Sequence, residues 1–180
     1  DNTTLSPMRT VTVSNVVSAP AGPSAGGDVV LHASTASVTG RWQIVPDASA
    51  ASGKRHYNAN PGAAKARAAS AAPTSAADLT FYAEQGKQYR LWIRGRADSN
   101  NWANDSVFVQ FSDSLDANGT AAWRMGTTSS TTVQVEEGTS VGLAGWGWAD
   151  NKYGGAGPLV SFATSRTHTM RLQIPEDGMS

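Results

Sequence analysis

Hydrophobic and polar residues alternate with a period of two over much of this 180-residue chain. The clearest case is KQYRLWIRGRA, residues 87–97. Successive side chains of a β-strand point to opposite faces, so this spacing predicts a strand with one buried face. The two faces would carry Tyr89, Leu91 and Ile93 against Arg90, Trp92 and Arg94.

The same alternation recurs in many short segments, separated by loops rich in Gly, Asn, Asp, Ser and Pro. Together they predict an all-β protein with about ten strands, arranged as an antiparallel β-sandwich or jelly roll. Residues 62–72 are rich in alanine but have no apolar stripe and run into Pro73, so we expect them to be irregular. The other strand candidates are residues 9–17, 28–34, 39–45, 77–84, 105–112, 121–125, 131–137, 158–163 and 166–175.

The composition argues against several classes of function. The formal net charge is zero, which does not favour nucleic acid or an anionic membrane as a partner. No apolar run approaches 18 residues, so we expect no membrane insertion. The absence of cysteine excludes disulfides and thiolate chemistry. Abundant Ala, Ser, Thr and Gly with little Lys and Glu lead us to expect a secreted or cell-surface protein.

The chain divides at a linker-like segment, APAGPSAGG, residues 19–27, which holds no large apolar residue. We therefore predict a strand-bearing extension and linker over residues 1–27 and a β-sandwich module over 28–180.

Catalytic motifs are not evident. Neither a G-x-S-x-G elbow nor a phosphate loop occurs, and His32, His56 and His168 have no neighbouring ligands at metal-site spacing. Paired glycosidase carboxylates cannot be read from sequence spacing, but the acidic residues here fall mostly in turn contexts. We expect a noncatalytic protein.

Aromatic residues in glycine- and asparagine-rich loops are the strongest functional signal. Trp102 lies in ADSNNWAND, and GWGWADNKYGG, residues 145–155, carries Trp146, Trp148 and Tyr153. A flat ring beside amides and carboxylates suits a sugar, whose apolar C–H face is ringed by hydroxyls. The alternative is that some of these rings fold back to close the end of the sandwich. Trp42 and Trp92 lie in strand patterns, where core or sheet-face packing is expected.

Two further segments are candidates. The loop ASGKRHYNANPG, residues 51–62, mixes cations, amides and Tyr57, and could join the other loops in one cleft or be an ordinary solvated turn. Asp105 could cap a turn before the next strand, or act with Asn104 on a ligand or a calcium ion.

The order of four segments resembles a galactose-binding-domain-like carbohydrate-binding module, of the kind found in families 6 and 35 of secreted bacterial proteins. These segments are residues 28–55, YRLWIRGRADSNNWANDSVFVQFS (89–112), GWGWADN (145–151) and HTMRLQIPEDGMS (168–180). The resemblance covers residues 28–180 and implies a noncatalytic jelly roll that binds a polysaccharide through its loops, often with a structural calcium. Carried over by position, the expected binding residues are Trp102, Asn104, Asp105, Trp146, Trp148 and Asn151, followed by Tyr57.

Modules of this kind continue after EDGMS into a closing strand, whereas the sequence given ends at Ser180. We therefore expect a sheet edge that needs another cover. RTVTVSNVV, residues 9–17, could supply it within its own sheet or in a neighbour's. The alternative function is thus a structural subunit of an extracellular filament or surface layer, a homo-oligomer assembled by strand addition. An ordinary first strand or interdomain segment is the simpler role for this extension.

Overall fold

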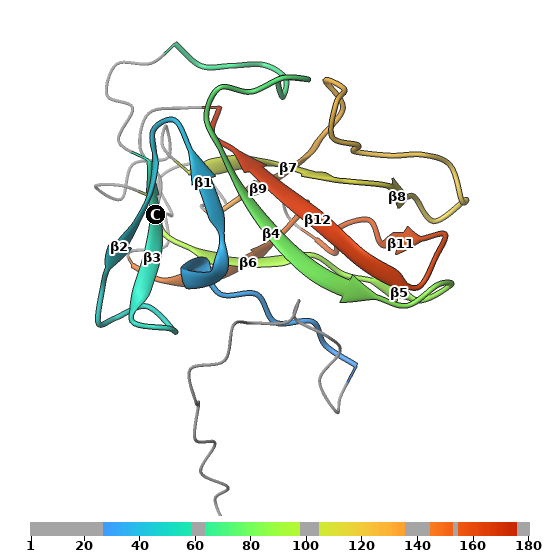
Figure 1. Cartoon of the computed structure of the whole chain (residues 1–180), viewed down its shortest axis with the longest axis horizontal. Coiled ribbons are helices and arrows are strands. Elements are labelled where there is room, and N and C mark those ends of the chain that lie inside the picture. Colours follow the sequence, from blue (N-terminus) through green and yellow to red (C-terminus); the bar gives the residue numbers. More distant parts are fainter. Residues whose placement is uncertain (1–26, 59–63, 98–104, 136–144, 153–154, 176–180) are drawn as a thin grey trace, which may run out of the picture.

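The computed structural model describes residues 27–58, 64–97, 105–135, 145–152 and 155–175. These residues form an all-β structure with one turn of 3-10 helix, η1 (Ala33–Thr35) (Figure 1). The strands are β1 (Ser37–Thr39), β2 (Trp42–Pro46), β3 (Lys54–Asn58), β4 (Ala76–Ala83), β5 (Gln88–Tyr89), β6 (Trp92–Gly95), β7 (Ser106–Phe111), β8 (Ser114–Leu115), β9 (Thr131–Gln134), β10 (Gly147–Asp150), β11 (Val160–Phe162) and β12 (Arg166–Gln173).

The largest sheet has five antiparallel strands in the order β1-β4-β12-β7-β9. Its long strands β4 and β12 pair from Arg166 opposite Ala83 to Leu172 opposite Ala77. The period of two in β12 is confirmed, because His168, Met170 and Leu172 are buried while the residues between them are more exposed. The sheet therefore turns one regular apolar face inward.

The opposite layer consists of three smaller antiparallel sheets: β10-β6, β5-β11-β8 and the hairpin β2-β3. The core between the layers includes Phe81, Phe111 and Phe162, whose ring centroids lie 5.5–6.3 Å apart with edge-to-face geometry. This confirms the predicted antiparallel β-sandwich. The finer jelly-roll topology stays a prediction.

Strand β7, which lies between β12 and β9, is buried on both faces, which the alternation in its sequence does not indicate. Gln110 is fully buried, and its Nε2 donates to the carbonyl oxygens of Thr127 and Ser129, each at 2.8 Å. Its Oε1 accepts a hydrogen bond of 2.7 Å from Gln173 Nε2, and Gln173 in turn bonds both backbone groups of Ser70. Loop backbone thus covers the outer face of β7.

Five predictions about elements are wrong. Residues 87–97 do not form one strand, because β5 and β6 pair with different sheets. Residues 54–58, expected in a loop, form β3, and residues 147–150, also expected in a loop, form β10. Residues 28–34 form no ladder and end in η1, although Val29 and Leu31 do pack on the core. Residues 121–125 contribute only isolated bridges.

These errors share a cause. Ladder hydrogen bonds between backbones decide which segments are strands, and they can include a segment with few apolar side chains, such as β3, which pairs with β2. The irregular structure expected near residues 62–72 is confirmed over 64–72.

Residues 1–26, 59–63, 98–104, 136–144, 153–154 and 176–180 lie outside the description. The predicted strand at 9–17 and the proposed domain boundary therefore stay predictions. Within the described ranges, no helix is long and apolar enough to cross a membrane.

Candidate functional site

The outer face of the β6-β10 sheet presents two large exposed aromatic side chains. Trp92 is 51% exposed and Trp148 is 63% exposed. On the inner face of the same two strands Ile93 lies opposite Ala149 and packs toward the core. Because side chains alternate between faces, the tryptophans point away from the core.

The register of the two strands brings these rings together. Trp148 lies directly opposite Arg94, and Trp92 lies opposite Asp150. Trp92 and Trp148 are therefore diagonal neighbours on one face, a separation that aromatic side chains can bridge. Trp92, Arg94 and Trp148 form what we call the platform. Within the described ranges, Arg94 makes no ion pair with a carboxylate.

Trp146 borders the platform but is held in place. Its Nε1 donates to Ser49 Oγ at 2.8 Å, and the guanidinium carbons of Arg94 and Arg96 lie 4.9 and 5.0 Å from its ring centroid. Trp146 is half-buried. The ring is thus fixed by cation–π contacts and a hydrogen bond rather than presented freely.

Asp47 organises this end of the β2-β3 hairpin. Its carboxylate accepts hydrogen bonds from Ser49 N at 2.9 Å and Ser49 Oγ at 2.5 Å, and pairs with Arg96 and Arg55 at 3.1 Å. The hydrogen bonds from Ser49, aided by the two arginines, lower the pKa of Asp47 below its usual 3.8. Ser49 therefore connects an anchored carboxylate to Trp146.

Asp150 and Asn151 hold the turn that follows β10. Asp150 accepts hydrogen bonds from Lys152 N at 3.0 Å and Gly157 N at 2.6 Å, and lies 3.6 Å from Arg90. Asn151 is 7% exposed, and its Nδ2 donates to Pro158 O at 3.2 Å. These contacts give both residues a structural role.

The other candidates from the sequence are dispersed. Tyr57 is half-buried on β3, with the Arg55 guanidinium 4.8 Å from its ring centroid. Asp105 is 3% exposed at the start of β7. Trp102, Asn104 and Tyr153 lie outside the described residues. Of the five candidate residues that the structure describes, it brings only Trp148 onto the platform and Trp146 to its border.

Sequence reasoning missed Trp92 and Arg94, and expected Trp92 to pack in the core or against a sheet. The signal was present in the alternation, since Trp92 shares a face with Arg90 and Arg94 rather than with Leu91 and Ile93. A tryptophan on the charged face of a strand faces outward. Trp42, by contrast, is buried as expected, at 5% exposure.

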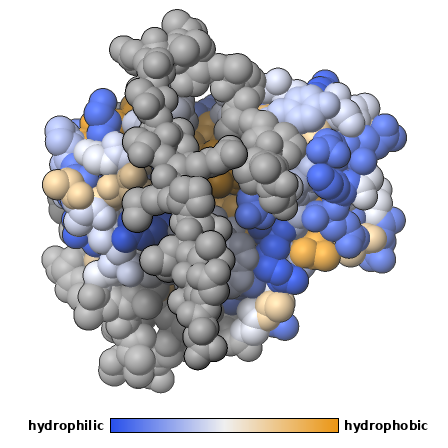
Figure 2. Space-filling model, turned by 90° about the horizontal axis from the view of Figure 1, so that it is seen from below, coloured by the Kyte–Doolittle hydropathy of each residue, from blue (hydrophilic) through white to orange (hydrophobic). Residues whose placement is uncertain are grey.

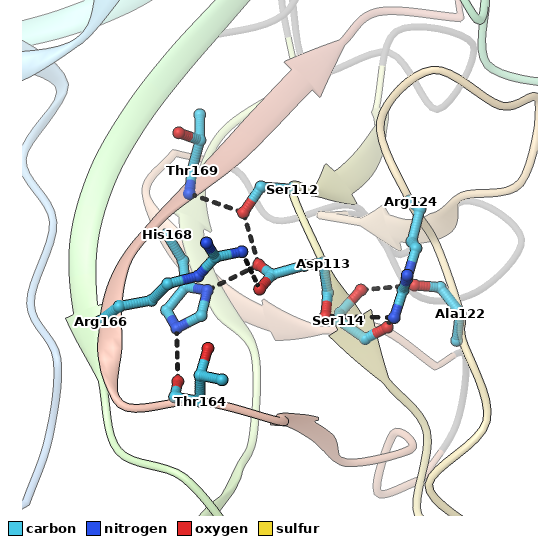
Figure 3. Close-up of polar contacts among 9 residues, drawn as sticks. All are labelled: Ser112, Asp113, Ser114, Ala122, Arg124, Thr164, Arg166, His168 and Thr169. Atoms are coloured by element: carbon cyan, nitrogen blue, oxygen red, sulfur yellow. Dashed lines mark hydrogen bonds and ion pairs between the residues drawn. The ribbon is translucent and has the colours of Figure 1, made fainter.

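Histidine chemistry does not suggest a second site. His168 is buried, and its Nδ1 lies 2.6 Å from Asp113 Oδ1 while its Nε2 lies 3.1 Å from Thr164 O (Figure 3). A substrate cannot reach an imidazole that has no exposed side-chain surface. Over the described ranges, no group of three or more His, Cys, Asp or Glu side chains is placed to hold a metal.

No protein-family model, curated protein or solved structure matches this chain. The resemblance to galactose-binding-like modules therefore stays a prediction.

Proposed function

We propose that this chain is a noncatalytic carbohydrate-binding module that acts outside the cell, secreted or at the cell surface. The observation that carries the proposal is the exposure of Trp92 and Trp148 side by side on the outer face of the β6-β10 sheet. Burying a tryptophan is strongly favourable, so two exposed rings on one face are a candidate binding surface.

The chemistry of the platform suits a polysaccharide. Each ring offers a flat apolar surface to the C–H face of a sugar, and Arg94 supplies hydrogen-bond donors for hydroxyl or carboxylate groups. The platform lies on a sheet face, so a chain of sugar residues could lie along it. This moves the proposed binding surface from the loops to the sheet.

Affinity electrophoresis through gels that contain different soluble polysaccharides tests the proposal. At least one polysaccharide should retard the natural chain. Trp92→Ala and Trp148→Ala should each weaken that binding by about tenfold or more, the effect expected of a tryptophan at the centre of a binding surface.

Tyr82→Ala is the matched control. Tyr82 is a partly buried aromatic residue of β4, in the other layer of the sandwich. Its loss should leave retardation unchanged. Circular dichroism must show that all variants stay folded. Binding that survives both tryptophan changes, or no binding to any polysaccharide, would refute the proposal.

A structural calcium ion, implied by the resemblance alone, is also proposed. Treatment with EDTA should then lower the thermal midpoint of unfolding, and added calcium should restore it, because a ligand that binds only the folded state stabilises it. An unchanged midpoint after EDTA would argue against calcium.

A further inference from the structure

A groove with a volume of about 960 Å³ opens between two extended segments, residues 27–33 and residues 87–95. Its floor is the apolar core, including Leu79, Phe81, Val107 and Met170. Figure 2 shows the molecule from below, where apolar surface is visible between hydrophilic areas. Val30 and Trp92, which also line the groove, are more than half exposed, so the groove offers apolar surface to a further segment.

The groove is bounded by the edges of two chain segments rather than by the face of a sheet. All the residues from Lys87 to Gly95 line it, and so do all those from Gly27 to Ala33. A segment that turned one face to the groove would contribute only every second residue. Within the described ranges, β6 has a ladder partner, β10, on one side alone. The open side of β6 therefore offers backbone groups to another strand.

The chain carries a segment with the right pattern for that position. In residues 9–17, Val11, Val13 and Val17 alternate with Thr10, Thr12 and Ser14. A strand of this sequence has a mainly apolar side, where Asn15 interrupts the valines, and a side of hydroxyl groups that ends in Val16. Placed in the groove, it would cover the core floor and turn its hydroxyl groups to solvent.

The route to the groove is short. Gly27 itself lines the groove, so the preceding residues start from its wall. Residues 18–26 form a nine-residue connection rich in Ala, Gly, Pro and Ser. Nine residues span at most about 30 Å, enough for the chain to double back along the groove. A tether of this length gives the segment an effective concentration in the millimolar range, which favours its own chain over a neighbour.

We propose that residues 9–17 of the same chain occupy this groove as a β-strand alongside β6. The inference does not rest on glycan binding, because the strand would pair with the open edge of β6. Trp92, Arg94 and Trp148 of the platform border the same groove, so the strand would lie beside them.

Substitutions on the two sides of the segment test this inference in the full chain. Val11→Asp with Val13→Asp puts two carboxylates on the apolar side, and should lower the thermal midpoint by about 5 °C or more. Amide protons of residues 88–95 should then exchange at least tenfold faster. Thr10→Asp with Thr12→Asp adds the same charge to the other side and should change both quantities little. Equal effects of the two pairs, or no effect of either, would overturn the proposal.

A spin label distinguishes the chain's own segment from that of a second copy. The natural sequence has no cysteine, so Thr12→Cys provides a single attachment site. In a chain that carries both the label and nitrogen-15, NMR signals of residues 88–95 should broaden. In a mixture of labelled unenriched chains and unlabelled enriched chains, they should stay sharp. Broadening in the mixture would show that a second copy supplies the strand, and no broadening in either sample would show that this segment does not fill the groove.

Discussion

At the residue scale, the cluster around Asp113 ties β12 to the turn after β7. The Asp113 carboxylate accepts hydrogen bonds from Ser112 Oγ at 2.6 Å and from Arg166 Nη2 at 2.7 Å, besides its contact with His168 (Figure 3). An acceptor oxygen faces each ring nitrogen of His168, from Asp113 on one side and from the Thr164 carbonyl on the other. The cluster thus joins the buried His168 ring of β12 to the carboxylate that follows β7.

This cluster predicts a loss of stability in acid. Burial alone would raise the pKa of Asp113, but the hydrogen bonds from Ser112, Arg166 and His168 outweigh it and lower the pKa from 3.8 to about 2. A carboxyl whose pKa is lower in the folded state stabilises the fold above its unfolded pKa. The contribution, roughly 2 kcal/mol, should therefore be present above pH 4 and be lost as the pH falls toward 2.

Urea unfolding of the natural chain and Asp113→Asn at several pH values measures the effect. The variant should be less stable near pH 7 and should lose less stability than the natural chain between pH 4 and pH 2. Parallel losses in the two proteins would mean that Asp113 does not carry this pH dependence.

At the element scale, single residues that are buried or have a positive φ determine how closely a turn or loop packs against a neighbouring segment. Gly40, between β1 and β2, has a φ of +63°, and a Cβ there would lie 2.4 Å from Thr74 O. Gly53, before β3, has a φ of +69° with open space around it. The positive φ favours glycine at both positions, but only at Gly40 does another backbone segment also lie too close for a Cβ.

Gly40→Ala should therefore destabilise the protein by about 3 kcal/mol or more, because backbone strain and a steric clash combine. Gly53→Ala should cost only the strain, about 1–2 kcal/mol. Chemical unfolding of the two variants gives the comparison. Equal losses would contradict the close contact between the β1-β2 turn and residues 74–75.

The glutamine pair beneath the loops makes a second prediction at this scale. Gln110→Ala removes a buried side chain and leaves the carbonyl groups of Thr127 and Ser129 without their donor, so we expect a loss of about 3 kcal/mol or more. Hydrogen exchange should also rise locally in residues 124–130. An exposed polar residue on a neighbouring strand, as in Thr132→Ala on β9, should have little effect.

The elements that the sequence predicts well are those with apolar alternation of their own. β4, β7 and β12 carry it, and all three lie in the five-stranded sheet. β3 has almost no apolar side chain, so nothing in its sequence indicates a strand. In β10 the inner residues are small and the outer ones are large, so the alternation is one of size rather than of polarity. A sequence of this kind resembles a glycine-rich loop. Trp146 lies just before β10, and its ring contacts Arg94, the residue opposite Trp148.

At the scale of the whole molecule, the platform and the groove meet at β6. One strand thus offers its outer face to a ligand and its open edge to another segment. The platform could be found only in part from sequence, because joining Trp92 to Trp148 needs the pairing of β6 with β10 across more than 50 residues of chain. Alternation predicts on which face of its strand each ring lies, but it does not predict which residue lies beside that ring on the neighbouring strand.

The most direct measurement of the central claim uses the indole N–H signals of the six tryptophans in the natural, nitrogen-15-labelled chain. A retarding polysaccharide, supplied as short oligosaccharides, should shift the signals of Trp92 and Trp148. The signal of Trp42, buried at 5% exposure, should not move. Saturable binding that leaves the Trp92 and Trp148 signals in place would contradict the platform as the glycan-binding surface.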